Sequence, residues 1–185
     1  MRVVSIYQAL SDKGNPEEIV KNGPFPCERT NAWFGVGYYF WEAFIDNAHW
    51  WGEQGYNSKY VICEAKCDLD PTKILDLVGN TDDILLFRDW TNELEKQGLV
   101  NSTTSVARIL HYIKECASSF DYEAIRGYGI NSISNKQTKI VFRRLFDPSK
   151  PQYLDLSPAI QLCIFEKTGL NLRNFKIVHP SKYIS

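Results

Sequence analysis

The order of apolar and polar residues along the chain predicts a mixture of strands and helices. Residues 2–10 form a run rich in β-branched side chains, which is typical of a strand. Residues 15–23 show the marks of a short helix, with Asn15 as N-cap, Pro16 at the first helical position and a glycine just past the end. Residues 24–33 hold two prolines and no period, and we expect a loop there.

The aromatic-rich segment that follows predicts a strand and then a helix. Residues 37–41 read as a strand, and residues 42–55 read as a helix that ends at a glycine. In that helix Phe44, Ala48 and Trp51 recur at positions i, i+4 and i+7, so they share one face.

The rest of the chain adds strands and a helical excursion. Residues 59–69 alternate as a long strand, and residues 73–77 continue in extended form. Residues 82 to about 120 turn helical and predict two helices against a sheet. Further strands are predicted at residues 138–146, 159–165 and 175–178, with a turn-rich loop at 147–153. Because strands and helices mix without regular alternation or repeats, we expect one α+β domain spanning residues 1–185.

Composition narrows the choice of partners. The net charge is −1, with 21 Lys and Arg against 22 Asp and Glu. The overall charge therefore does not indicate a nucleic-acid or membrane partner. A local basic patch is compatible with this balance, so nucleic acid is not excluded. No apolar run approaches the roughly 18 residues that a membrane span needs, and the first residues do not form a signal peptide. The five scattered cysteines favour reduced thiols, and we expect a cytoplasmic protein.

The segment from Asn31 to Trp51 combines Gly-x-Gly with nine aromatic residues. It does not fit a Rossmann phosphate loop, because it precedes a strand and lacks the third glycine. It does not fit a P-loop either, because the sequence holds no Gly-Lys-Ser/Thr. The three histidines share no spacing typical of a metal site, and no metal is expected.

The motif resembles the NAD-binding core of the ADP-ribosyltransferase superfamily, in its diphtheria-toxin and poly(ADP-ribose) polymerase branch and its small bacterial domains. The residues that carry the resemblance are Gly35, Gly37, Tyr39, Phe40, Trp41 and Glu42, followed by Ala48 and Trp50. The segments 5–25, 61–77 and 159–165 match further parts of that pattern. The resemblance implies two small packed sheets with an NAD cleft between them, and the helices of residues 80–120 as an insertion.

The resemblance also implies a nicotinamide pocket. Tyr39 would stack on one face of the nicotinamide ring and Trp50 on the other. The backbone of Ala9 would pair with the carboxamide, and Asn47 would add a hydrogen bond. Gly35 and Gly37 would let the loop approach the dinucleotide closely.

Three positions depart from the family pattern. Gln8 replaces the ribose-binding histidine, Ala9 replaces a glycine, and Gln161 replaces the catalytic glutamate. A neutral amide can hold a hydroxyl, but it offers no full negative charge to an oxocarbenium-like state. From position alone, Glu42 is a candidate to compensate by turning toward the cleft, and Arg29 is a candidate to pair with the pyrophosphate.

Two functions follow from these residues. The first is NAD-dependent mono-ADP-ribosyl transfer, or NAD hydrolysis, with NAD as substrate and an unknown macromolecular or small-molecule acceptor. The alternative is a catalytically degenerate module of the same fold that binds NAD, a nucleotide or a protein. A third class also stays open, a purely structural or phage-type interaction protein that uses its exposed aromatic residues. Taken residue by residue, the aromatic side chains are then an ordinary sheet face, the glycines form a turn and Glu42 favours the dipole of a helix.

Overall fold

The computed structural model describes residues 2–116, 120–128, 133 and 142–184 of the 185-residue chain. Its helices are α1 (Pro16–Asn22), α2 (Ile45–Gly55), α3 (Thr81–Lys96) and α4 (Val106–Cys116). Its strands are β1 (Arg2–Ser11), β2 (Tyr38–Glu42), β3 (Tyr60–Leu69), β4 (Ile74–Asp76), β5 (Ala124–Tyr128), β6 (Arg143–Leu145), β7 (Tyr153–Asp155), β8 (Ile160–Ile164) and β9 (Arg173–His179). Two short 3₁₀ turns lie at Gly169–Asn171 and Ser181–Tyr183. The predicted α+β class is confirmed.

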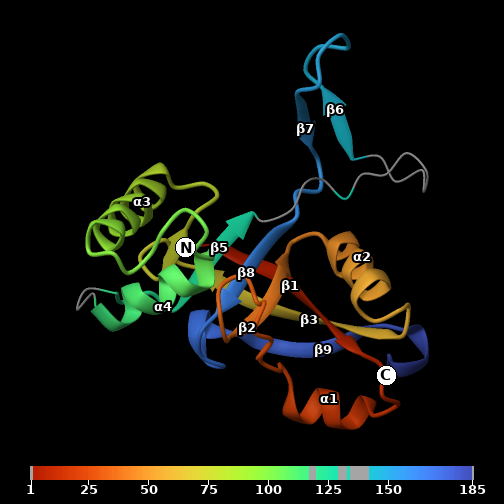
Figure 1. Ribbon diagram of the computed structural model, residues 1–185. Helices are drawn as coiled ribbons and strands as arrows, with labels where there is room; N and C mark the ends of the chain where they lie inside the picture. The colour runs from red at the N-terminus through yellow and green to blue at the C-terminus, as the bar shows by residue number, and fades with distance from the viewer. Residues whose placement is uncertain (1, 117–119, 129–132, 134–141, 185) are drawn as a thin grey trace.

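One mixed sheet dominates the fold. Seven strands lie in the order β4-β5-β8-β2-β1-β3-β9, and all neighbours are antiparallel except the parallel pair β4 and β5. The strands β6 and β7 form a separate ribbon that projects from the body (Figure 1). The expected pair of small packed sheets is therefore wrong, because β1–β2 and β2–β8 pairing joins these strands edge to edge.

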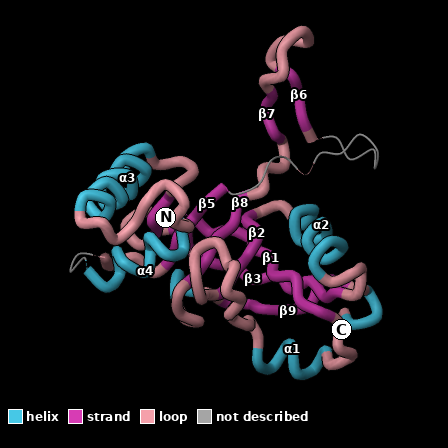
Figure 2. The backbone as a smooth tube through the Cα atoms, viewed as in Figure 1, coloured by secondary structure: helices cyan, strands magenta, loops and turns pink. Residues whose placement is uncertain are grey.

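Side chains alternate across the large sheet, so its two faces carry different covers. On one face Ile6 and Phe40 are buried, and α1 packs Ile19 over the part of that face formed by β3 and β9. On the other face α2 contributes Ala48, and α4 contributes Leu110. Figure 2 shows α1 and α2 on opposite sides of the strands. We call these the α1 face and the α2 face.

A buried ion network on the α1 face ties the centre of the sheet to its edge. The Arg126 guanidinium donates to Glu42, with an Nε–Oε2 distance of 2.6 Å, and to the two Asp76 oxygens at 3.0 and 3.1 Å. Arg2 also donates to Glu42, at 2.9 Å. The side chains of Arg126 and Glu42 are only 15% and 4% exposed. The network thus fixes β2 against β5, although β8 lies between them.

Most predicted elements are confirmed within about two residues of their ends. The prediction misses β5 and places β7 partly in a loop. It also ends the strand of β2 one residue early, since Glu42 is part of β2 and α2 begins at Ile45. The strand predicted at 138–146 is confirmed at Arg143–Leu145, and residues 138–141 lie outside the described residues.

Two sequence expectations concern thiols and membranes. All five cysteines are free, and Cys63, Cys67 and Cys163 are buried. Burial raises the pKa of each of these three thiols to about 12 and holds them protonated. None of the described helices has the length and apolar composition to cross a membrane.

Replacing Arg126 tests the ion network. Arg126→Met leaves the buried Glu42 carboxylate with a single, largely exposed arginine partner, so we expect a loss of about 3–5 kcal/mol in the free energy of unfolding. Chemical denaturation measures it. Arg88→Met is the control, because Arg88 pairs with Asp89 at 4.0 Å on the surface. Equal effects of the two substitutions would contradict the network's structural role.

Candidate functional site

The central feature of the site is a gap between β1 and β2. Their pairing ends at Tyr7↔Trp41. The Ser5 carbonyl accepts a hydrogen bond from the Ala43 N–H of the segment that follows β2, so Ser5 turns its backbone groups toward β2. Because these groups alternate along a strand, Ala9 turns its N–H and C=O the same way. They therefore face the gap, beyond the last paired residues.

The side chain of Gln8 spans this gap. Its Nε2 donates to the Phe25 carbonyl at 2.8 Å, and its Oε1 accepts from the Phe25 N–H at 3.1 Å. Nε2 also makes a long contact of 3.4 Å with the Tyr39 carbonyl, which would accept from Ala9 if the strands stayed paired. Gln8 is 5% exposed. Its amide thus anchors the loop after α1, and its expected ribose contact competes with these bonds.

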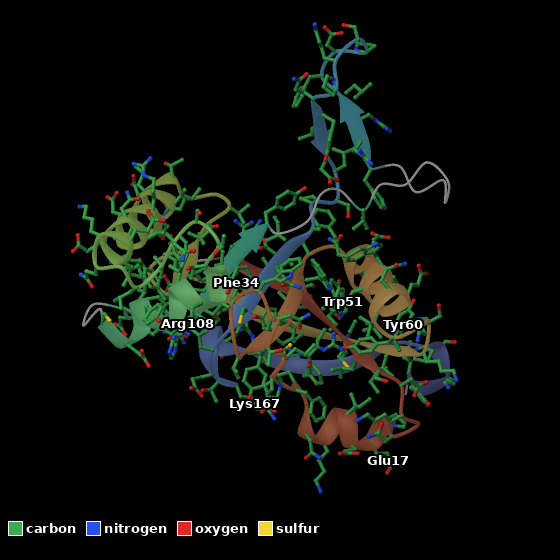
Figure 3. The ribbon with its side chains drawn as sticks, in the orientation of Figure 1. Glu17, Phe34, Trp51, Tyr60, Arg108 and Lys167 are labelled. Atoms are coloured by element: carbon green, nitrogen blue, oxygen red, sulfur yellow. The ribbon has the colours of Figure 1, made fainter. Side chains whose placement is uncertain are left out.

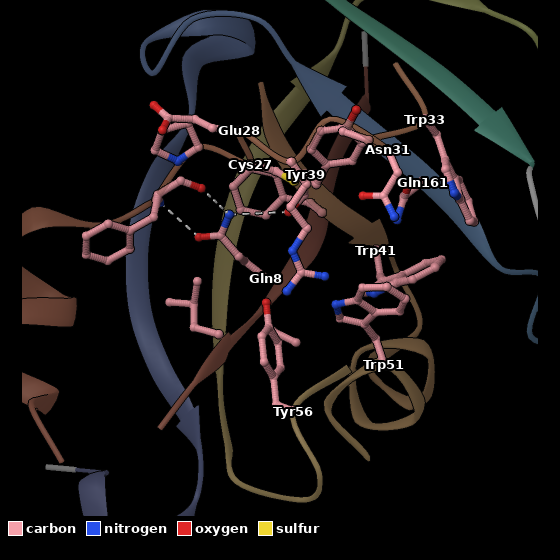
Figure 4. Close-up of a pocket in the computed structure, with 17 residues that line it drawn as sticks. Gln8, Cys27, Glu28, Asn31, Trp33, Tyr39, Trp41, Trp51, Tyr56 and Gln161 are labelled. Atoms are coloured by element: carbon pink, nitrogen blue, oxygen red, sulfur yellow. Dashed lines mark hydrogen bonds between the residues drawn. The ribbon is translucent and has the colours of Figure 1, made fainter. Parts of the chain in front are cut away.

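A pocket of about 270 Å³ opens at this gap (Figure 4). We call it the strand-gap pocket. The strands and α2 supply its floor and one wall, through Gln8, Ala9, Tyr39, Trp41, Trp51 and Gln161. The loop between α1 and β2 supplies the opposite wall. The structure thus brings Gln8, Ala9, Tyr39 and Gln161 together around one pocket.

Indole rings build the wall on the α2 face. Trp41 meets Trp33 edge to face at 6.5 Å between centroids and meets Trp50 in the same way at 6.3 Å. Trp51 borders the pocket, and Trp50 does not. The expected nicotinamide clamp of Tyr39 and Trp50 is therefore wrong in its second member, because Trp41 packs against Trp50 and Trp51 faces the cavity.

Tyr39 borders the pocket while its hydroxyl holds the glycine loop. The hydroxyl donates to the Gly35 carbonyl at 2.7 Å and accepts from the Phe34 N–H at 2.8 Å. Its ring stacks on Phe34 with centroids 6.2 Å apart. Burial, above all other causes, raises the pKa of Tyr39, so the hydroxyl stays protonated. Tyr39 therefore fixes the loop and offers its ring to the cavity.

Gly35 and Gly37 are required by the backbone conformation and packing of the loop before β2. Gly35 has a φ of +82°, which an L side chain rarely adopts. Gly37 bridges to Cys27, and a Cβ on Gly37 would lie 2.5 Å from the Cys163 sulfur. Neither glycine borders the strand-gap pocket. The close approach to a dinucleotide expected of them is therefore wrong: Gly37 instead approaches β8, and Gly35 provides the positive φ of the loop.

Two further residues expected in the site, Glu42 and Asn47, do not line the pocket. Glu42 shares its face of β2 with Phe40, opposite to Tyr39, and Arg126 holds it there. Its expected turn toward the cleft is wrong, because the strand continues through this residue. Asn47 is fully buried and donates to the Pro158 carbonyl at 3.1 Å, so it ties α2 to the segment before β8 rather than to the cavity.

Gln161 and Arg29 are two polar side chains that line the pocket. The Gln161 Oε1 atom is buried and has no hydrogen-bond donor among the described residues. Arg29 borders the pocket, with its guanidinium carbon 5.8 Å from the Tyr56 ring centroid. Of the described residues that line the pocket, Glu28 alone has a carboxylate. The described residues hold no cluster of three His, Cys, Asp or Glu suited to a metal ion.

Sequence reasoning missed part of the pocket wall. It identified Trp41 only as part of the motif, chose Trp50 over Trp51, and gave no role to Trp33 or Tyr56. The available signal was the shared helical face of Ala48 and Trp51, since Ala48 is buried against the sheet.

Comparison of the chain with family models, with curated proteins and with solved structures finds no match. The functional argument therefore depends on the residues of the pocket. The resemblance to the ADP-ribosyltransferase superfamily stays a prediction.

Replacing Gln8 tests the anchor of the loop. Gln8→Leu keeps the volume but leaves the N–H and C=O of Phe25 without partners, so we expect about 1–3 kcal/mol of destabilisation in chemical denaturation. Gln97→Leu, which removes an exposed bond to Glu93, is the control. A stability equal to that of the control variant would show that the loop does not depend on Gln8.

His49 lies where α2 packs on β3, and its protonation makes the stability of the fold depend on pH. Its Nδ1 lies 3.0 Å from the Tyr60 hydroxyl, and its ring centroid lies 4.9 Å from that of His179. Burial, and then the charge of His179, lower the pKa of His49 below its usual 6.5, although Asp46 and Glu53 oppose this shift. The folded state thus favours neutral His49, so the contribution of His49 to stability is fully present above pH 6.5 and is lost as the pH falls from that value towards the lowered pKa.

We expect the melting temperature to fall between pH 7.5 and 5.0, and to fall less in His49→Gln. Thermal melts at both values measure this difference. His111→Gln on α4 is the matched control, because the side chain of His111 is 48% exposed beside Glu115. If His49→Gln leaves the pH dependence of the melting temperature unchanged, His49 is not its source.

Proposed function

We propose that the strand-gap pocket binds the nicotinamide end of NAD, and that the protein serves as an NAD-binding module. The observation that carries the proposal is the gap after Tyr7↔Trp41, which turns the N–H and C=O of Ala9 toward the pocket. A primary carboxamide has one acceptor oxygen and two donor hydrogens. It therefore matches this donor and acceptor pair, as a neighbouring strand would.

The aromatic wall suits the same ligand. Tyr39 and Trp51 border the cavity with half-buried rings and offer flat apolar surface to a pyridinium ring, whereas Trp41 is only 3% exposed. A positively charged ring gains further from the electron-rich face of an indole. Arg29, on the opposite loop, is placed to meet a negatively charged pyrophosphate. The pocket thus offers partners to each part of the nicotinamide half of NAD.

The charges around the pocket favour binding over efficient chemistry. Cleavage of the glycosidic bond develops positive charge on the ribose, which a nearby carboxylate stabilises. Glu42 lies on the α1 face in an ion network, and Gln161 is neutral. Glu28 belongs to the exposed loop wall. The residues in the pocket therefore provide recognition with little stabilisation of a cation.

ADP-ribosyl transfer to an unidentified acceptor, or hydrolysis of NAD, is the second candidate function. The buried, unpaired Oε1 of Gln161 favours it, because this atom can accept a hydrogen bond from a ribose hydroxyl. Incubation with labelled NAD separates the two candidates. Release of nicotinamide supports the enzyme, and saturable binding without release supports the module.

Proline substitution tests the backbone contact directly. Ala9→Pro removes an N–H that faces the gap and leaves the ladder with β3 intact, so we expect at least about a tenfold loss of nicotinamide affinity by calorimetry. Ser11→Pro is the matched control, because Ser11 lies two residues further on the same side of β1 and does not border the pocket. Unchanged affinity in a folded Ala9→Pro protein would contradict the proposal.

A further inference from the structure

A second pocket of about 540 Å³ lies on the far side of the loop that walls the strand-gap pocket. We call it the helix-edge pocket and define it by Trp33, Phe34, Leu77, Val106, Gly127 and Tyr128. Residues 31–33 border both pockets. In Figure 3, Phe34 lies beside α4 and β5, whereas Trp51 lies toward α2. The two pockets are therefore neighbours that share one wall.

The helix-edge pocket has a flat apolar interior. Phe34 is 7% exposed and packs on Gly127, where a Cβ would come within 2.4 Å of its ring. Tyr128 at the end of β5 and Val106 at the start of α4 are 44% and 39% exposed. Exposed apolar side chains around a concave site are typical of a ligand pocket, and the volume suits a small molecule.

Polar groups without charge surround this interior. Thr30, Asn31 and Ser105 line the pocket, and none of its described lining residues carries a charged side chain. The side chains of Thr30 and Asn31 form no hydrogen bond with the described part of the chain. The Ser105 hydroxyl accepts only a long bond of 3.4 Å from the Arg108 N–H. Hydrogen-bond capacity therefore lies beside the aromatic surface, with no cation to hold a phosphate.

We propose that the helix-edge pocket binds a neutral nucleobase. A nucleobase offers a flat face to the partly exposed ring of Tyr128, with the buried Phe34 beneath the pocket, and a row of donors and acceptors to Thr30 and Asn31. An aromatic peptide side chain would contact the apolar interior but would make little use of these exposed polar groups, which would keep water as their partner. This assignment goes beyond the proposed function and does not depend on what the strand-gap pocket holds.

Titration with adenosine tests the proposal, because adenosine carries a base without a phosphate. We expect saturable binding, with shifts in the amide NMR signals of Gly127 and Tyr128. Val106→Asp places a hydrated charge on the apolar wall at the first residue of α4, where an acidic side chain suits the helix. We expect it to weaken adenosine binding at least about tenfold and to leave nicotinamide binding unchanged.

Ile84→Asp is the matched control, since Ile84 is 41% exposed in the first turn of α3 and does not line the pocket. Absence of saturable adenosine binding overturns the proposal. Equal weakening by Val106→Asp and Ile84→Asp, or tighter binding of N-acetyl-tryptophanamide than of adenosine, also overturns it. Because nicotinamide and adenosine are titrated separately, failure of the nicotinamide proposal and failure of the nucleobase proposal are distinguished.

Competition identifies where the base comes from. If NAD displaces adenosine and Val106→Asp weakens NAD but not nicotinamide, the base is the adenine of the dinucleotide. If NAD and adenosine bind together, the base belongs to a second molecule, which makes the helix-edge pocket an acceptor site. Both results support a nucleobase site.

Discussion

The parting of β1 and β2 after Tyr7↔Trp41 is the constraint on which the site depends. A sheet that stayed paired would use the backbone of Ala9 internally and leave no room for a ligand. Gln8 bridges the opening by bonding the Phe25 backbone, so the loop after α1 becomes the opposite wall. Buried polar groups need partners, and this single amide meets that need for the Phe25 backbone and the Tyr39 carbonyl, while the backbone groups of Ala9 stay free for a ligand.

The rest of the molecule keeps the opening in place. On the α1 face, Glu42 and Arg126 fix β2 against β5, so the strand beside the gap cannot slide. On the α2 face, Trp41 borders the pocket and packs edge to face against Trp33 and Trp50. Because side chains alternate along β2, Glu42 joins the ion network on one face, and Tyr39 and Trp41 border the pocket on the other. Binding capacity and rigidity come from opposite faces of one strand.

The sequence predicts the long elements well and the facing of single residues less well. β1, β3 and the four helices show their periods clearly, whereas β5 is five residues long and is recognised only through its partners. One extra residue in β2 moves Glu42 to the other face, because side chains alternate with a period of two. One residue along α2 separates Trp50 from Trp51, a rotation of about 100° on a helix. Tertiary pairing decides such one-residue choices.

The exposure of the Ala9 N–H to the gap is the claim most directly open to measurement. Residue-resolved amide hydrogen exchange compares Ala9 with Gln8 and Leu10, whose backbone groups face β3. The account predicts faster exchange at Ala9 in the free protein, and marked slowing at Ala9 alone when nicotinamide is added. An Ala9 amide that exchanges as slowly as its neighbours, and does not respond to nicotinamide, would contradict the account.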